Sequence, residues 1–430
     1  MMSSRVPFAF VHCADLHLDS PFEGLFSKNE RLASLLREAT FQAFDNVISV
    51  AIENNAAFVL IGGDIYDGAD NSLRAQIRYA DTLAKAARHN IRCFAAHGNH
   101  DPVKAWRANI AMPEGVHVFG AEKVERIPVV REGQVLAHVY GISHADYRLK
   151  QNLAAKFRRQ QEDEYAIGLL HCNVGACVDH DDYAPCTTAD LHEGKMDYWA
   201  LGHIHSRMIL SDKAPLIVYP GNTQGRSIKE TGEKGCCLVR VQADGSSDIQ
   251  FHATDVLRWF QEDLTISETE TIDSLRQKLF AKQQELRVQA KQRGSISRLT
   301  ITGRSSLHEM LRQSDIVRDL LADLNDGEER RSDFAWFDSI AIKTRPAIDI
   351  DKRREVPDLV GDFLRSADAL RQGTETTAKA ESVREVLLSR PESNKIKQII
   401  MAFSDQELLE LLDAAEISGL DLLLAGEEAE

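Results

Sequence analysis

The sequence lacks long hydrophobic runs. No apolar run in its 430 residues approaches the roughly 18 residues that a membrane-spanning helix needs. The first residues, Met1 to Val11, also lack a basic segment followed by a long apolar stretch, so they indicate a first strand and not a signal peptide. We therefore expect no membrane span and no secretory leader.

Cysteine is sparse, and no pair has the Cys-x-x-Cys spacing of zinc sites and redox motifs. The odd count of seven does not suit a complete disulfide framework in a chain of this length. We expect reduced thiols, mostly buried as small apolar groups, and hence a cytoplasmic protein.

Basic residues are in the minority, and the formal net charge is -15. An enzyme that acts on nucleic acid usually carries a basic footprint, so this balance weakens such a function. However, nine acidic and no basic residues lie between Met401 and Glu430, and the other 400 residues carry only -6. The charge therefore does not exclude DNA as a partner.

Short apolar runs, each too short for a helix, alternate with helical patterns from Val6 to about residue 255. The runs followed at once by Gly, Asp, His or Asn are Phe8–Val11, Phe58–Ile61, Cys93–Ala96, Ala166–Leu170 and Tyr198–Leu201. Helical patterns include Arg31–Asn54 and Ser72–Asn90. Later runs indicate mixed or antiparallel strands at Val116–Phe119, Val135–Gly141, Leu216–Tyr219 and Cys236–Val241. The pattern predicts an α/β fold with layers packed on a central sheet.

Two further regions follow, which we place at residues 256–345 and 346–430, after a first domain over 1–255. The second domain has the pattern of a small α/β unit, with strands Trp259–Ile266, Arg298–Thr302 and Phe334–Thr344 and helices Ile272–Arg293 and Ser306–Leu324. Pro346 to Asp358 is charged and indicates a linker. The last region has amphipathic helical patterns at Leu359–Arg371, Lys379–Ser389, Ser393–Phe403 and Asp405–Ala415.

Five segments share one arrangement, in which an apolar strand is followed by side chains that can bind metal. They are Asp15-Leu16-His17, Gly62-Gly63-Asp64, Gly98-Asn99-His100-Asp101, His171 and Gly202-His203-Ile204-His205. Sites in α/β proteins form at the carboxyl ends of strands, so these segments can converge. We predict Asp15, His17, Asp64, Asn99, His171, His203 and His205 as metal ligands.

Seven ligands exceed what one ion needs and suit two ions that share a carboxylate. We assign Asp64 as the bridge. One ion would be completed by Asp15, His17 and His205, and the other by Asn99, His171 and His203. Mixed imidazole and carboxylate sets favour Mn, Fe or Zn, whereas sets of oxygen ligands favour Mg or Ca.

Two cations neutralise a phosphodiester and lower the pKa of a bound water from ~15.7 to near 7. The leaving alkoxide then needs a proton. His100 lies beside Asn99 and is not needed as a ligand, so we interpret it as the general acid, with Asp101 orienting it or stabilising its charge. His12 and His97 lie within apolar runs and indicate core residues or supports of ligands, and Asp67 indicates either a support or a turn residue.

Each segment alone has an ordinary structural explanation. Asp-x-His occurs often by chance, Gly-Gly-Asp can be a turn, and Gly-Asn-His-Asp can be a loop that uses left-handed conformations. His203 and His205 can be one buried and one exposed histidine. Five such segments, each at a strand end and in this order, are hard to obtain by chance, so we favour the metal site.

These blocks resemble the calcineurin-like metallophosphoesterase superfamily, whose motif order is Asp-x-His, Gly-Asp-x-x, Gly-Asn-His-Asp/Glu, His and Gly-His-x-His. The likeness covers residues 6 to about 230. Within the superfamily the sequence is most similar to the bacterial DNA-repair exonucleases of the SbcD type, and more closely to the YhaO-like branch. The residues that carry this likeness are His12–Asp19, Gly62–Asp67, His97–Asp101 and Tyr219–Arg226.

The resemblance implies a four-layer α-β-β-α sandwich with a small capping domain and a helical C-terminal tail. It implies a Mn²⁺-dependent exonuclease acting on double-stranded DNA ends in repair, with Fe, Zn or Mg as alternative metals. It also implies a coiled-coil ATPase partner of the SMC-like SbcC type and a homodimer. The family's dimetal ligands fall on the seven residues above, and its transition-state histidine falls on His100.

Two departures from the family pattern accompany this likeness. Asp67 stands near the place where archaeal and eukaryotic relatives carry a histidine, and Asn222 stands where the nucleases have the serine of Pro-Gly-Ser. The last helices suit either a docking segment for the ATPase or packing on the cap. The alternative functions are a phosphoesterase for small-molecule or phosphoprotein substrates and a non-catalytic clamp on DNA ends.

Overall fold

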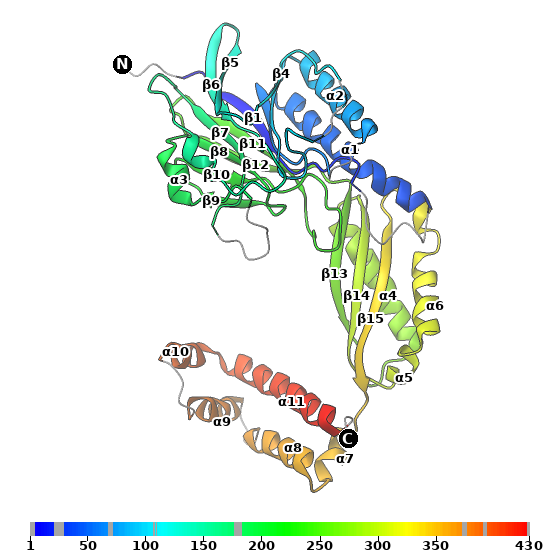
Figure 1. Cartoon of the computed structure of the whole chain (residues 1–430). Coiled ribbons are helices and arrows are strands. Elements are labelled where there is room, and N and C mark those ends of the chain that lie inside the picture. The colour runs from blue at the N-terminus through cyan, green and yellow to red at the C-terminus, as the bar shows by residue number, and fades with distance from the viewer. Residues whose placement is uncertain are drawn as a thin grey trace. The chain divides into compact units, whose positions relative to one another are not determined.

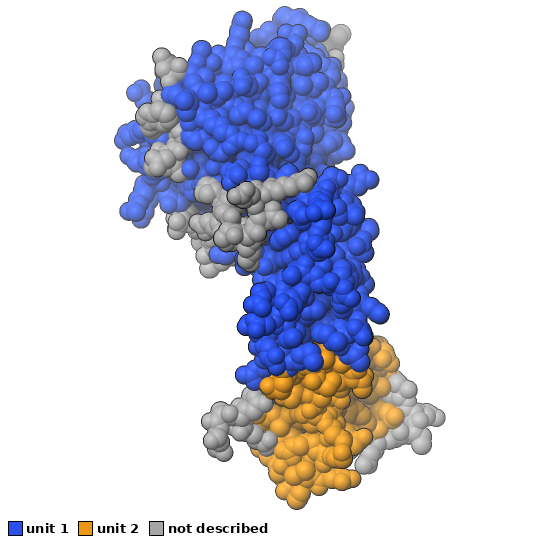
Figure 2. All heavy atoms as spheres, turned by 90° about the vertical axis from the view of Figure 1, so that its right-hand side faces the viewer, with its two compact units in different colours: residues 1–265, 271–302, 310–343 blue, residues 266–270, 303–309, 344–430 orange. Residues whose placement is uncertain are grey.

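The structure is a computed structural model of the chain, and it describes residues 5–20, 30–67, 72–105, 108, 110–175, 183–371, 376–389 and 394–427. The chain divides into two compact units (Figure 2). The first unit comprises residues 1–265, 271–302 and 310–343, and the second comprises 266–270, 303–309 and 344–430. The division into domains at residues 255 and 345 stays a prediction.

Two six-stranded sheets form the larger part of the first unit (Figure 1). In spatial order the first sheet is β12 (Ser247–Ala253), β11 (Gly235–Val241), β1 (Phe8–Cys13), β2 (Phe58–Gly62), β3 (Arg92–Ala96) and β4 (Val116–Val118). The second is β5 (Glu125–Arg131), β6 (Gln134–Gly141), β7 (Ala166–His171), β8 (Tyr198–Gly202), β10 (Leu216–Tyr219) and β9 (Met208–Ser211). The predicted strands are all present, and β5, β9 and β12 are additional.

The inner strands of both sheets are parallel. β1, β2, β3 and β4 pair in parallel, as do β6, β7, β8 and β10. Antiparallel strands complete the edges, where β11 pairs with β1 and β12, β5 with β6 and β9 with β10. Parallel strands that are covered on both faces need continuous apolar sequence, and this is the pattern of the inner strands.

Four layers result from the packing of these elements (Figure 1). Helices α1 (Glu30–Glu53) and α2 (Leu73–Arg88) cover one face of the first sheet through a fully apolar core. The two sheets face each other across an aromatic core, in which the ring of Phe10 from β1 meets that of Tyr198 from β8 edge-on at 5.2 Å. The short elements α3 (Thr188–Glu193) and η1 (Ala154–Lys156) cover the outer face of the second sheet. The predicted α-β-β-α fold class is confirmed.

A three-stranded sheet with helices follows the sandwich in the chain and belongs mostly to the first unit. Its elements are β13 (Leu257–Thr265), α4 (Ile272–Gln289), β14 (Gly294–Ser305), α5 (His308–Leu311), α6 (Ser314–Asn325), η2 (Glu328–Arg330) and β15 (Ala335–Pro346). The last residues of β14 and β15 and the first residues of α5 belong to the second unit. Trp259 of β13 packs against Leu36 of α1 in one buried cluster. The prediction of a single helix over Ser306–Leu324 is wrong, because Gln313 has an extended backbone with ψ 118 that separates α5 from α6.

The second unit is helical after β15. It contains α7 (Ile350–Glu355), α8 (Leu359–Leu370), α9 (Thr376–Leu388), α10 (Asn394–Ala402) and α11 (Asp405–Glu427). The predicted linker thus contains α7, which Asp349 caps by accepting a hydrogen bond from the Lys352 amide. Helix α11 continues past the predicted end at Ala415 to Glu427, and at Gly419 it lies close to the ring of Phe363. Among the described residues, no helix is long and apolar enough to span a bilayer.

Candidate metal centre

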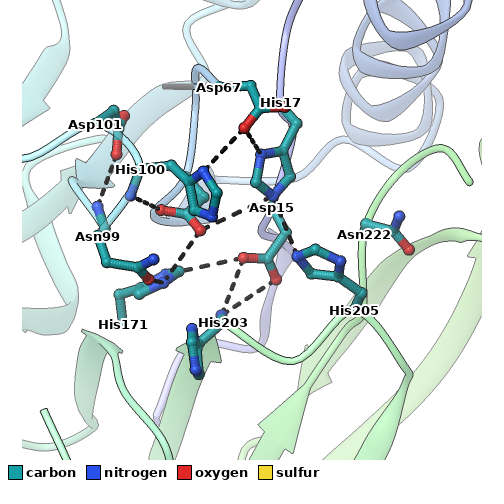
Figure 3. A network of polar contacts seen from close by, with 12 residues as sticks. Asp15, His17, Asp67, Asn99, His100, Asp101, His171, His203, His205 and Asn222 are labelled. Carbon is teal, nitrogen blue, oxygen red and sulfur yellow. Dashed lines mark hydrogen bonds and ion pairs between the residues drawn. The ribbon is translucent and has the colours of Figure 1, made fainter. Parts of the chain in front are cut away.

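The five predicted segments meet at the carboxyl ends of parallel strands from both sheets (Figure 3). The loops after β1 and β2 are joined by backbone hydrogen bonds, from the Asp15 amide to Gly63 O at 3.0 Å and from the His17 amide to Asp64 O at 3.0 Å. The β8 loop is joined to them because the His203 amide donates to both oxygens of Asp15, at 3.0 and 3.2 Å. Segments nearly two hundred positions apart therefore form one rigid cluster.

The backbone at this cluster is strained. Asp15, His17, Asp64 and His203 have φ values of 52, 43, 48 and 102 degrees, which place non-glycine residues in the left-handed region. Such conformations cost about 1–3 kcal/mol each and persist where the surrounding fold imposes them. In this protein they turn the side chains of Asp15, His17 and Asp64 into the cluster, and at His203 they aim the backbone amide at Asp15.

One side of the cluster brings together Asp15, His17 and His205, whose ligand atoms lie within 4.8 Å of one another. The Nε2 atoms of the two histidines are 3.2 Å apart. His205 Nδ1 donates to Glu230 Oε1 at 2.8 Å, so its Nε2 presents a lone pair. Two imidazole nitrogens that face each other beside a carboxylate suit a cation between them.

The other side brings together Asp15, Asp64 and His171. His171 Nδ1 lies 2.9 Å from Gly62 O and donates to it, which leaves Nε2 as a lone pair. This Nε2 lies 2.9 Å from Asn99 Oδ1 and 3.4 Å from Asp64 Oδ2, which are both acceptors. Three acceptor atoms that converge without a proton between them form a second cation position.

The protonation states of the cluster agree with this interpretation. Burial raises the pKa values of Asp15 and Asp64 to about 7 each. Burial also holds the pKa values of His17 and His171 well below the usual range, so both are neutral, as metal ligands must be. Two buried carboxylates are costly side by side unless cations compensate their charge, so the residues present fit a pair of divalent ions.

Two of the predicted roles, His203 as a ligand and Asp64 as the bridging carboxylate, are not resolved by the close ligand atoms. Among the described residues, the groups of close ligand atoms do not include a ring nitrogen of His203, whose ring packs 5.2 Å from that of His171. Asp64 Oδ2 lies 3.9 Å from His17 Nε2 and 3.4 Å from His171 Nε2, between the two sides, while Asp15 belongs to both groups. The ligand role of His203 and the bridging role of Asp64 stay predictions.

His100 stands at the open side of the cluster, with its side chain 41% exposed. Its Nδ1 lies 2.9 Å from Asp67 Oδ1, and its amide donates to Asp64 Oδ1 at 2.9 Å. Burial lowers the pKa of His100, but the contact with Asp67 and the charge of Asp64 outweigh it and raise the pKa to about 9. The imidazole is therefore an imidazolium at neutral pH, which is the form that can donate a proton.

Asp101 is fully buried below the loop. Its oxygens accept from the amides of Gly98 at 2.8 Å and Ile65 at 3.1 Å, and from His97 Nδ1 at 2.9 Å. The carboxylate that the structure places against His100 Nδ1 is Asp67, so orientation of His100 by Asp101 stays a prediction. His97 and His12 are both buried, and His12 has hydrogen bonds to Tyr198 and Leu201, so a role of either residue in supporting a ligand stays a prediction.

Glycines shape the walls of the centre. A Cβ at Gly98 would overlap the carboxylate of Asp64 and the ring of His171. Gly63 has a φ of +99 degrees, and a Cβ there would strike the ring of His171. The backbone at both residues therefore lies so close to the candidate ligands that a side chain would not fit between them.

Two charged residues of the centre were not assigned to it from the sequence, although Arg226 ends the segment Tyr219–Arg226 that carries the family likeness. Glu230 binds His205, and Arg226 Nη1 donates to Asp67 Oδ2 at 3.0 Å. Both lie in the loop after β10, far along the chain from the strand ends that they touch. Their distance from an apolar strand hides them from a search for polar residues at strand ends.

Comparison with known proteins identifies the class of this centre. Residues 8–207 match the calcineurin-like phosphoesterase family, and residues 259–345 match the middle domain of metallophosphoesterase YhaO. The chain therefore contains a calcineurin-like metallophosphoesterase domain followed by a YhaO-type middle domain, and the resemblance noted in the sequence is confirmed. This family uses a dinuclear metal site and hydrolyses phosphoesters, in agreement with the candidate ligand groups.

Three relatives share part of their length with this chain. The chain is 37% identical over 266 residues to the uncharacterized metallophosphoesterase YhaO of Bacillus subtilis (strain 168), covering 62% of this chain and 65% of that protein. It is 29% identical over 227 residues to the DNA double-strand break repair protein Mre11 of Thermoplasma acidophilum, covering 49% of this chain and 58% of that protein. The Mre11 protein of Archaeoglobus fulgidus is 28% identical over 239 residues, or 52% of each chain. The matches thus span about half to two thirds of these relatives.

Proposed function

We propose that the protein is a two-metal phosphodiesterase that hydrolyses the ends of double-stranded DNA. The observation that carries this proposal is the convergence of lone pairs on two sides of one cluster. His17 and His205 meet on one side, and His171, Asn99 and Asp64 meet on the other. We assign Asp15, His17, Asp64, Asn99, His171, His203 and His205 to the metals, and Mn²⁺ as the expected metal because the set mixes imidazole and carboxylate.

Bound divalent cations would supply charge neutralisation of the phosphodiester and a water of lowered pKa. The chain's own residues then hold the reacting groups. Asp64 accepts a hydrogen bond from the His100 amide and thereby fixes the segment that carries the general acid. His100 reaches out from this segment with a raised pKa and donates its proton to the leaving alkoxide.

DNA as the substrate is supported by the relatives named as double-strand break repair proteins. The middle domain also supports it, because a small substrate seldom needs so much additional chain beside the phosphoesterase domain. We further propose a coiled-coil ATPase of the SMC-like type as a partner, docked on the helices after residue 346, together with a homodimer and a cytoplasmic location. Exposed apolar side chains on these helices, such as Leu359 and Ile417, support a docking role.

The test compares blunt duplex DNA with a chromogenic phosphodiester, both with Mn²⁺ and with the ATPase partner supplied. Cleavage of DNA that stops on chelation and returns with Mn²⁺ is the expected result. Turnover of the small ester alone would overturn the nuclease function and favour a small-molecule or phosphoprotein substrate. Metal content by mass spectrometry should give two ions per chain.

A further inference from the structure

Arg226 contacts two carboxylates beside the metal centre, Asp67 and Glu230. Its Nη1 donates to Asp67 Oδ2 at 3.0 Å and to Ser20 Oγ at 3.2 Å, and its Nη2 lies 3.4 Å from Glu230 Oε1. The Arg226 amide also donates to Glu230 Oε2 at 2.6 Å. The side chain is only 16% exposed, so the guanidinium depends on these two carboxylates for compensation of its charge.

Each carboxylate in turn holds imidazoles of the site. Asp67 Oδ1 contacts His100 Nδ1 at 2.9 Å and His17 Nδ1 at 3.5 Å. Glu230 Oε1 contacts His205 Nδ1 at 2.8 Å. Carboxylates behind histidines fix the tautomer and ring orientation, and their loss typically costs about 10- to 100-fold in metal affinity or activity. Arg226 therefore joins the carboxylate that supports the proton donor to the carboxylate that supports a metal ligand.

The loop that carries Arg226 is anchored by the middle domain. Trp259 Nε1 donates to Gly225 O at 2.9 Å, directly before Arg226 in the chain. Gln224 Oε1 accepts from the Val256 amide at 2.9 Å, and Gln224 Nε2 donates to Leu257 O at 2.9 Å. Strand β13 therefore holds the backbone on the N-terminal side of Arg226, while Glu230 holds the other side.

We propose that Arg226 is a positioning residue that makes the orientation of His100 and His205 depend on how β13 is seated. We name the group Asp67, Arg226 and Glu230 the carboxylate clamp. The clamp gives the middle domain a physical route to the chemistry without touching the phosphate. This inference rests on the proposed function for its kinetic consequences, but its effect on metal binding is independent of the substrate.

The first experiment replaces Arg226 by Gln and by Lys. Arg226→Gln should lower kcat on DNA about 10- to 100-fold, with KM changed by less than about twofold, because orientation and not ground-state binding is lost. The loss of rate in Arg226→Gln should be smaller on a chromogenic diester than on DNA, because the phenolate of the diester leaves without needing a proton. Arg226→Lys should not restore the rate, since one ammonium cannot hold two carboxylates as a planar guanidinium does.

The matched control is Arg240→Gln, which removes the same charge from β11, where Arg240 binds Asn54 and Gln250. A rise in KM with kcat preserved in Arg226→Gln would overturn the proposal and assign Arg226 to the phosphate itself. Equal losses on DNA and on the chromogenic diester would remove the route through His100.

The second experiment tests the anchor and does not use activity. Trp259→Phe keeps the apolar ring but removes the hydrogen bond to Gly225, and Trp336→Phe is the matched change in the same cluster from β15. Calorimetric titration with Mn²⁺ should show several-fold weaker binding for Trp259→Phe and unchanged binding for Trp336→Phe. Glu230→Ala should weaken Mn²⁺ binding about 10- to 100-fold, with Glu230→Gln between it and the wild type. Equal Mn²⁺ affinity in all of these variants would overturn the clamp, whereas failure of the wild type to cleave any diester would overturn only the proposed function.

Discussion

The first unit and the second unit use buried space differently. At the strand ends of the first unit, polar groups such as Asp15, Asp64 and His171 are at most 1% exposed beside a large apolar core. In the second unit, burial is limited to small clusters around residues such as Leu364 and Leu408. Large apolar side chains remain at the surface there, with Leu359 70% and Leu422 77% exposed.

The two units therefore tolerate different unfavourable features, namely strained backbone and buried charge in the first and exposed apolar surface in the second. The large core of the first unit stabilises the fold strongly enough to hold strained backbone and buried charge at one place, which is the usual condition for catalytic groups. The helices of the second unit bury little and leave apolar surface in water, which is the usual condition for a surface that meets a partner.

The largest expected effect is on chemistry in the first unit. His100→Ala should lower DNA cleavage about 100- to 10,000-fold, the usual contribution of a general acid. Metal content should stay normal, because the His100 amide, not its ring, is bonded to Asp64. His89→Ala, an exposed histidine at the end of α2, is the control. Unchanged cleavage would remove His100 from the mechanism.

A matched pair of core substitutions tests whether the units are separately stable. Leu83 of α2 and Leu364 of α8 are both fully buried, and each Leu→Ala change should destabilise its own unit by about 2–5 kcal/mol. Hydrogen exchange should show faster exchange in the sandwich only for Leu83→Ala, and in α8 and α11 only for Leu364→Ala. Loss of protection in both units from either change would show that they unfold together.

The metal-free protein should lose stability as pH rises. The pKa values of Asp15 and Asp64 are raised to about 7 in the folded state, so folding binds protons there that the unfolded chain releases near pH 4. Stability from these groups is fully present below about pH 4 and is lost as pH rises from there through about 7, by on the order of 1 kcal/mol per pH unit. Thermal unfolding between pH 5 and 8 measures this loss.

Asp64→Asn is the comparison for this pH series. The substitution should flatten the pH dependence, since the amide does not titrate, and Mn²⁺ should abolish it in the wild type. A metal-free thermal midpoint that increases with pH over this range would contradict the assignment of a buried pair of carboxylates.

The smallest effect on stability belongs to the exposed face of the second unit. Leu359→Ser should change the free energy of unfolding by less than about 0.5 kcal/mol, because its side chain already contacts water. Association with the ATPase partner should weaken if the helices dock it, as size-exclusion chromatography of the mixture would show. A large fall in thermal midpoint would mean that this surface is covered within the chain.

The sequence predicted the strands and the clustering of the polar segments because both follow from local rules. A short apolar run followed by Asp or His, as at Asp64 and His171, identifies a strand end wherever it occurs. The partner of His100 could not be found in this way, since Asp67 meets it only through the conformation of two loops. Glu230 was invisible for the same reason, because it is placed by the anchoring of its loop on β13. The end of α11 was also missed, because the helix continues through Gly419 to Glu427, whereas the low helix propensity of glycine favours an earlier end.

At Gly98 the backbone lies against the candidate metal ligands with a hydrogen atom in place of a Cβ. One methyl group there would take the volume of the Asp64 carboxylate while leaving both sheets and their core untouched. The space that the Asp64 carboxylate and the His171 ring occupy is therefore set by the absence of one methyl group at Gly98.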